Sequence, residues 1–210
     1  MKTLEDKRTL SKWFAHTANW FVLFVRTGGE DSVVARVQRK LDPEKYVVFV
    51  PTKDRAFRKK SKVETIKAQW MSGYVFIAAT VDETELLEAV APLIMNDPNI
   101  YRLLANGSPS DGVKLTERDK SIMTALLDET FNIPAVEAVF VGDEVKIVES
   151  SLEGFGGRVK RVNKHKYSAT IEMDMFGKTI DCEIMLEYLT KPEKVIKANG
   201  YDGSGSEVSL

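Results

Sequence analysis

The sequence has few of the residues that most often carry catalysis or bind metals. Its 210 residues include one cysteine and two histidines. A single cysteine, Cys182, excludes a disulfide within the chain and a cysteine-only metal cluster, and it fits a reducing compartment. Cys182 alternates into the apolar face of its segment, as a small core residue does. His16 and His165 lie far apart in polar stretches. We therefore expect no metal, no cofactor and no enzymatic activity.

Long apolar runs are also missing. The longest runs, such as WFVLFV, fall far short of the roughly 20 residues that a membrane-spanning helix needs. The opening residues, MKTLEDKRTLSKW, lack the apolar segment of a signal peptide. These absences predict a cytoplasmic protein that does not enter a membrane, and we expect it to be a monomer.

The net charge of -1 hides a segregated distribution of charge. Residues 53–62 read KDRAFRKKSK, with a single acid, and residues 158–166 read RVKRVNKHK, with none. Residues 82–97 carry acids and no base. Segregation of this kind can direct binding even when the total charge is near zero.

In the first half of the chain, segments whose apolar residues have the pattern of strands alternate with segments whose apolar residues have helical spacing. Apolar runs at 19–25, 46–50 and 73–79 predict strands, and 100–104 can form a fourth. Apolar positions at helical spacing predict helices after the first strand and after Asp82, which has capping-box spacing with Glu85. The order β-α-β-β-α-β is the split arrangement of ferredoxin-like folds. The basic segment between the second and third strands is long enough for a hairpin.

The second half predicts one more helix and then a small barrel. Thr116 and Asp119 are expected to cap the helix. From Val141 the apolar period changes to two, which favours a β-barrel of about five strands. We expect a polar extension at 1–16, a first domain at 17–130, a linker at 131–140, a second domain at 141–191 and a disordered tail at 192–210.

The stretch LEGFGGRVKRVNKHK raises the question of whether its glycines cradle a phosphate. Val159 stands where a dinucleotide fingerprint needs its last glycine, and no GK[ST] follows. Gly154, Gly156 and Gly157 are therefore expected to shape a turn that launches a basic strand.

Two basic clusters predict contact with the phosphates of RNA or DNA. Each basic cluster contains or adjoins an aromatic residue, Phe57 or Tyr167. The alternative is that the lysine-rich hairpin is simply solvated, which requires no aromatic residue. The candidate cations are Arg55, Arg58, Lys59, Lys60, Lys62, Arg158, Lys160, Arg161, Lys164 and Lys166. Trp70 and Met71 precede the Ser72-Gly73 turn, where an apolar cluster can form a protein-docking patch.

Several segments together resemble a known family. NWFVLFVRTGGE, the basic hairpin and WMSGYVFI are similar to the NGN domain of NusG-type transcription elongation factors. VGDEVKIVESSLEGFGGRVKRV resembles a KOW motif, and MDMFGKTIDCEIMLEYL resembles the closing hairpin of that domain, with Phe176 at its tip. The resemblance covers Thr17 to Lys191.

The resemblance implies an α+β protein: a ferredoxin-like NGN domain with a basic hairpin insert, followed by a five-stranded KOW β-barrel. It also implies a transcription factor rather than an enzyme. The NGN domain would dock on the clamp helices of RNA polymerase through Trp70, Met71 and Tyr74, with Trp20 and Phe24 beneath or beside them.

Departures from the housekeeping pattern point to a specialised paralogue. Trp70-Met71-Ser72 replaces the usual two aromatics and proline, and Arg26 stands where an aromatic is common. The chain looks most like the LoaP branch, antiterminators that recognise a leader RNA hairpin. Two alternatives stay open. A housekeeping NusG would bind Rho or a ribosomal protein near Phe176, and an RNA-recognition motif would use residues 72–76, which match its pattern only in part.

Overall fold

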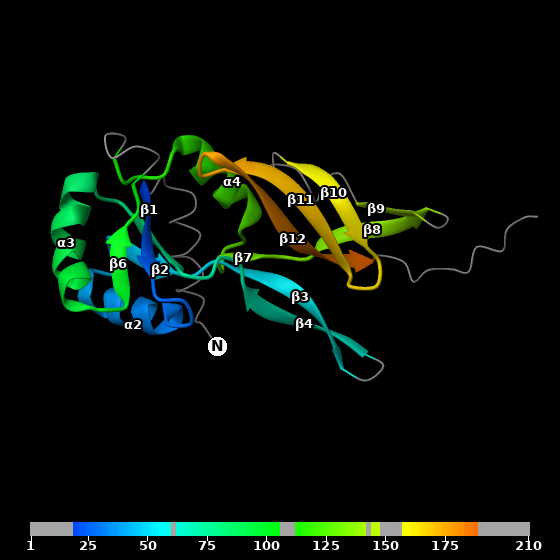
Figure 1. The fold of residues 1–210 in the computed structure, drawn as a ribbon, viewed down its shortest axis with the longest axis horizontal. Helices are drawn as coiled ribbons and strands as arrows, with labels where there is room; N and C mark the ends of the chain where they lie inside the picture. The colour runs from blue at the N-terminus through cyan, green and yellow to red at the C-terminus, as the bar shows by residue number, and fades with distance from the viewer. Residues whose placement is uncertain (1–18, 60–61, 106–111, 142–143, 148–156, 189–210) are drawn as a thin grey trace, which may run out of the picture.

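The computed structural model describes residues 19–59, 62–105, 112–141, 144–147 and 157–188. The expected extension at 1–16, the tail at 192–210, Lys60, Gly154 and Gly156 lie outside these ranges. The fold is α+β, as the sequence predicted. Figure 1 shows two helices on one side of a four-stranded sheet and a barrel-like sheet on the other side.

The four-stranded antiparallel sheet has the order β2-β5-β1-β6. Its strands are β1 (Asn19–Val25), β2 (Tyr46–Phe49), β5 (Tyr74–Ala79) and β6 (Ile100–Leu103). The two helices are α2 (Glu30–Lys40) and α3 (Glu83–Asn96). The predicted β-α-β-β-α-β order is confirmed, with the basic hairpin inserted between β2 and β5.

Both faces of this sheet are apolar. Side chains of successive strand residues point to opposite faces, so Phe21 and Leu23 pack beneath the helices, in a cluster with Val33 and Leu86. Trp20, Val22 and Phe76 belong to a second cluster on the other face. This second face must also be covered, and α4 (Glu117–Leu126) and the barrel cover it.

The predicted helix starts are confirmed by their caps. The Asp82 side chain accepts a hydrogen bond from the Glu85 N–H over 2.9 Å at the start of α3. The Thr116 hydroxyl accepts one from the Asp119 N–H over 3.0 Å at the start of α4. Each cap satisfies a backbone donor that lacks a partner within the helix.

The barrel-like sheet has the order β10-β11-β12-β8-β9. Its strands are β8 (Val136–Val141), β9 (Glu144–Ile147), β10 (Arg158–Asn163), β11 (Ser168–Met175) and β12 (Lys178–Tyr188). The alternation expected in the sequence is confirmed on β11 and β12, where Ile171, Met173, Cys182 and Ile184 are all buried.

The segment expected as a linker, 131–140, carries two strands. β7 (Asn132–Ile133) pairs in parallel with β3 (Thr52–Lys59), and β8 belongs to the barrel. Asp54 holds this segment, because its carboxylate accepts from Asn132 Nδ2 over 3.0 Å and from the Ala135 N–H over 3.1 Å. The barrel core and the second face of the sheet therefore form one continuous cluster.

The basic hairpin is confirmed as an antiparallel ribbon of β3 and β4 (Lys62–Gln69). We call it the β3–β4 ribbon. In Figure 1 its far end projects away from both the four-stranded sheet and the barrel. Among the described helices, none is long and apolar enough to cross a membrane.

Candidate protein and nucleic-acid interfaces

Three of the residues expected to dock a protein partner line one cavity. Trp70, Met71 and Tyr74 surround about 420 Å³ of space between the four-stranded sheet and the barrel, together with Phe176. All three are half-buried. Trp20, in contrast, is only 3% exposed, so it supports this surface from within the core.

Phe24 extends the cavity surface across the sheet. Its ring centroid lies 5.7 Å from that of Tyr74 and 5.2 Å from that of Tyr101. We call Tyr74, Phe24 and Tyr101 the aromatic row. Tyr101 on β6 is 52% exposed. Sequence reasoning missed Tyr101 because only the pairing of β6 with β1 brings it beside Phe24.

A buried carboxylate fixes the turn that precedes Tyr74. Glu30, at the start of α2, is 3% exposed, and its Oε1 accepts a hydrogen bond from the Gly73 N–H over 2.6 Å. Burial alone would raise the pKa of Glu30, but this and other hydrogen bonds outweigh burial and hold the pKa below its usual value. An ionised Glu30 therefore holds the Ser72-Gly73 turn against the helix.

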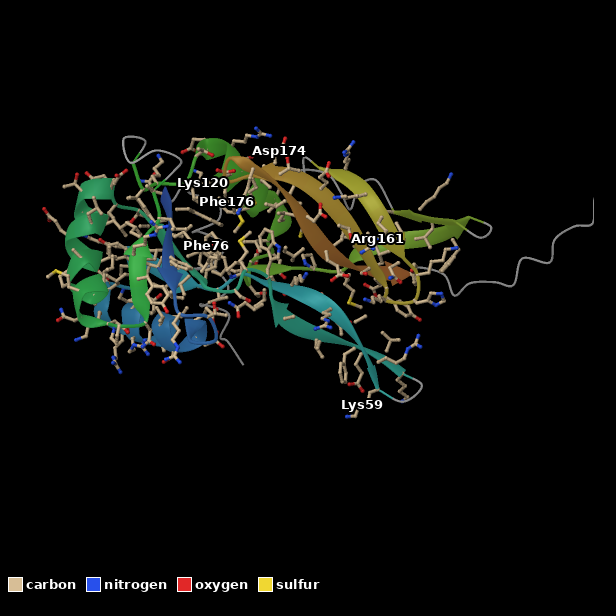
Figure 2. All side chains as sticks on the ribbon, viewed as in Figure 1. Lys59, Phe76, Lys120, Arg161, Asp174 and Phe176 are labelled. Carbon is tan, nitrogen blue, oxygen red and sulfur yellow. The ribbon has the colours of Figure 1, made fainter. Side chains whose placement is uncertain are left out.

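The tip of the barrel hairpin lies against the first domain. Phe176 and Gly177 both have positive φ, 55° and 70°, and they form a two-residue turn between β11 and β12. The Phe176 N–H donates to Asp119 Oδ1 on α4 over 2.9 Å. Figure 2 shows Phe176 on the side of the barrel that faces the four-stranded sheet. Phe176 therefore lines the same cavity as the expected docking residues Trp70, Met71 and Tyr74.

Cys182 has the environment of a core residue. Burial raises the pKa of its thiol to about 11, and nearby Lys53 and a hydrogen bond with Trp70 offset only part of this rise. The thiol therefore stays protonated near neutral pH, and a protonated thiol is a poor nucleophile. Within the described ranges, no three His, Cys, Asp or Glu residues gather in a way that could hold a metal ion.

The two basic clusters of the sequence meet in one groove. A groove of about 350 Å³ separates the β3–β4 ribbon from the β10–β11 turn of the barrel. Arg55 and Arg58 line one wall, and His165 and Lys166 line the other. Lys53 Nζ donates to the Glu183 carbonyl over 2.9 Å and ties the ribbon to β12. We call this space the basic groove.

The candidate cations divide into paired and unpaired groups. Arg158 lies 2.7 Å from Glu172, and Lys160 lies 3.0 Å from Asp181 and 3.4 Å from Glu172. The hydrogen bond with Asp181 is the main reason why the pKa of Lys160 is raised. These acids neutralise part of the charge on β10.

The remaining described cations have no acidic partner among the residues that the structure describes. Among the described residues, none forms an ion pair with the side chains of Arg55, Arg58, Lys59, Lys62, Arg161, Lys164 or Lys166. Figure 2 shows Lys59 near the far end of the ribbon and Arg161 on the barrel. The unpaired positive charge therefore belongs to both domains, and Arg55, Arg58 and Lys166 of this group line the basic groove.

Gly157 has a different role from the one expected. Its φ lies outside the left-handed region that Gly28, Gly73 and Gly177 occupy. A Cβ atom on Gly157 would lie 2.6 Å from the Glu172 carbonyl oxygen and 2.8 Å from Ile171 Cγ2. Glycine at this position therefore allows close packing of the chain on β11, rather than a positive φ.

Comparison with known proteins agrees with this architecture. Residues 18–124 match the family model described as NusG, transcription termination factor nusG. The transcription termination/antitermination protein NusG of Thermus thermophilus is 21% identical over 184 residues, which cover 82% of this chain and 97% of that protein. The NusG of Bacillus subtilis is 20% identical, with 82% and 98% covered, and that of Lactococcus lactis is 24% identical, with 79% and 88% covered.

A solved structure that concerns the domain interaction in Thermotoga maritima NusG is 18% identical and covers 82% of this chain and 94% of that chain, with a TM-score of 0.46. The family model spans the four-stranded sheet, both of its helices and most of α4. Because that match covers more than half of the sequence, the chain belongs to the NusG family.

Proposed function

We propose that this NusG-family transcription factor is a specialised antitermination factor of the LoaP type. It binds RNA polymerase through its NGN domain and a structured leader RNA through the basic groove, and it promotes readthrough of terminators. The names of the relatives support a role in termination or antitermination. The family consists of transcription factors, so we assign no enzymatic activity.

The observation that carries the RNA half of this proposal is the basic groove. Its two walls come from different domains, and both present cations that lack acidic partners among the described residues. A-form RNA offers phosphates and 2′-hydroxyls at its surface, so proteins bind it largely by shape and charge. A groove between a projecting ribbon and a barrel turn can hold such a backbone from two sides.

The aromatic row supports the polymerase half. Trp, Tyr and Met are typical anchors of protein interfaces, and the clamp helices would take an apolar surface of this kind. In the described arrangement, Phe176 of the β11–β12 turn lines the same cavity as Trp70 and Met71, and all three pack against one core cluster. We therefore infer that docking displaces this turn from α4, and that the exposed Tyr101 makes the first contact.

The alternatives fit the structure less well. A housekeeping NusG would bind its protein partners at the Phe176 tip, which becomes free only when docking has displaced the turn from Asp119, whereas the basic groove is already open in the described arrangement. An RNA-recognition motif uses the open face of its sheet to stack bases. Here that face is covered, since Trp20 and Phe76 are 3% and 1% exposed. Both comparisons favour RNA binding at the basic groove.

Two measurements on the purified full-length chain test the proposal. In the first, the chain is titrated with a leader-type RNA hairpin at two salt concentrations, and with an unrelated single strand for comparison. We expect preference for the hairpin and a log–log salt slope that grows by about 0.7 to 0.9 for each phosphate contact. In the second, binding of the chain to immobilised core RNA polymerase is measured, and we expect the polymerase to retain the chain. Failure to discriminate the hairpin would favour the protein-partner alternative, and failure to bind polymerase would contradict the docking assignment.

A further inference from the structure

The outer face of the β3–β4 ribbon is unusually apolar for an exposed, basic element. Phe57 is 48% exposed and Ile66 is 39% exposed. In the ribbon Phe57 lies opposite Glu64, Arg55 opposite Ile66, and Lys59 opposite Lys62. Residues directly opposite each other share a face of an antiparallel pair. Phe57 and Ile66 therefore lie on one face with three cations.

The part of this face that carries Phe57, Lys59 and Lys62 lies outside the lining of the basic groove. Strand residues alternate between faces, and Arg58 with its partner Val63 points to the opposite face from Phe57. Arg58 and Val63 both line the groove, and so does Arg55 at the near end of the Phe57 face, whereas Phe57, Lys59 and Lys62 do not. Among the described residues, no ring contacts Phe57, and Phe57 belongs to neither core cluster. The ring is open to a partner.

Two features of the outer face indicate that the partner is an anion with a flat apolar part. Like charges directly opposite on neighbouring strands destabilise a sheet, and Lys59 and Lys62 form such a pair at the end of the ribbon. An anion that binds between them would relieve this repulsion. An aromatic ring between cations, in turn, suits a nucleotide, because every base has a face that can stack on it.

We propose that Phe57 stacks on an unpaired base of a single-stranded nucleic acid, and that Lys59 and Lys62 hold the flanking phosphates. This site rests on the RNA-binding function proposed above and adds a second contact further along the same ribbon, outside the groove lining. It takes the single-stranded part of the nucleic acid, while the basic groove takes the structured part.

Glu64 gives the site a preference among bases. Its carboxylate lies on the same face as Phe57, directly across the ribbon, and no described residue pairs with it. A carboxylate repels phosphate but accepts a hydrogen bond from an exocyclic amino group, such as N4 of cytosine. The stacked base is therefore one with an amino group, and uracil is disfavoured.

The test uses the full chain and two RNA probes that share one stem. The first probe is a blunt 12-base-pair duplex, and the second is the same duplex with a six-nucleotide adenine extension that contains 2-aminopurine. We expect Phe57→Leu to weaken binding of the extended probe about tenfold, and to abolish quenching of 2-aminopurine. Phe57→Tyr should keep both the affinity for the extended probe and the quenching. Ile66→Leu, which changes an apolar neighbour that has no ring, should alter neither of these two quantities.

Further arms separate this site from the basic groove. Substituting Arg58 and Lys166 with Gln should weaken both probes, whereas Phe57→Leu should weaken only the extended one. An all-uracil extension should bind less tightly than the adenine extension, and Glu64→Gln should narrow that difference. An extension made of DNA should bind with similar dependence on Phe57, because stacking does not involve the sugar.

Three results would overturn the site. In the first, Phe57→Leu binds the extended RNA as the wild type does, while the variant with Gln in place of Arg58 and Lys166 still binds both probes less tightly. The basic groove would then account for all of the RNA binding. In the second, Phe57→Leu weakens both probes equally, which would show that the ring supports the groove. In the third, neither probe binds, but polyglutamate does so in a manner that depends on Phe57, which would make the partner an acidic protein.

Discussion

The backbone N–H of Phe176 donates a hydrogen bond to Asp119 Oδ1 over 2.9 Å and joins the tip of the barrel to the first turn of α4. Asp119 is 4% exposed, and its other oxygen accepts from the Thr116 hydroxyl over 2.8 Å. One buried carboxylate thus serves both a helix cap and the contact between the domains. The same contact keeps Phe176 at the cavity that Trp70 and Met71 line.

Replacing Asp119 with Ala should loosen the barrel from the first domain. The substitution leaves the Phe176 N–H without its acceptor, and a lost buried hydrogen bond costs about 1–3 kcal/mol. We expect lower stability in denaturant and tighter binding to RNA polymerase, because the docking residues become more accessible. Glu117→Gln, on the exposed side of the same helix turn, is the control. Weaker polymerase binding in the folded Asp119 variant would show that the turn does not hinder docking.

Tyr101→Ala should weaken polymerase binding by about 1–3 kcal/mol if this exposed ring is an interface anchor. The ring is half-exposed, so stability should change by no more than about 0.5 kcal/mol. Met95→Ala provides a control, because Met95 is 85% exposed on α3, which covers the opposite face of the sheet. Equal affinities for the two variants would remove Tyr101 from the docking surface.

The unpaired cations should matter more for RNA than the paired ones. Replacing both Arg58 and Lys166 with Gln should lower the log–log slope of RNA affinity against salt concentration by about 1.4 to 1.8. Replacing both Arg158 and Lys160 with Gln should change this slope less, because Glu172 and Asp181 already neutralise these side chains. Titration of both variants at several salt concentrations measures the difference. A larger loss in the Arg158 and Lys160 variant would place the RNA on the outer face of β10.

Gly157→Ala should destabilise the barrel by about 1–3 kcal/mol, the usual range for overpacking. The added methyl group meets backbone of β11 at 2.6 Å, and backbone cannot move aside as a side-chain end can. Gly177→Asn is the matched control, since nothing lies within 4 Å of its Cβ position and Asn tolerates a positive φ. Thermal unfolding measures both. Equal melting temperatures would contradict the close-packing role of Gly157.

Cys182 should make stability depend on alkaline pH. Burial raises the folded pKa of the thiol from 9.0 to about 11, so the unfolded chain releases this proton first. The contribution of the protonated thiol to the free energy of unfolding is therefore fully present below pH 9, and it is lost as the pH rises through 11. Comparison of the free energy of unfolding at pH 8 and pH 11 tests this, with Cys182→Ala as the reference. The wild type should lose more stability than the variant, and an equal loss would contradict the assigned environment.

The sequence by itself determined the elements and their order. The apolar run at 19–25, the capping spacing of Asp82 and Glu85, and the alternation of Ile171, Met173 and Met175 are local signals. Each reflects hydrogen bonding or burial within a few residues, and each predicted the observed element. The candidate cations and docking aromatics were visible for the same reason, because charge and residue type are properties of the sequence.

The tertiary structure alone decided how these residues combine. Pairing of β6 with β1 brings Tyr101 beside Phe24, 77 positions away in the chain, and the ribbon meets the β10–β11 turn to make the groove. Within 131–140, β7 forms because β3 and Asp54 supply its partners from a distant segment, and β8 forms because β12 pairs with it. Which cations stay unpaired likewise depends on cross-strand register, which sets Arg158 opposite Glu172 but Lys59 opposite Lys62. Long-range pairing and packing create these relationships, and no local pattern encodes them.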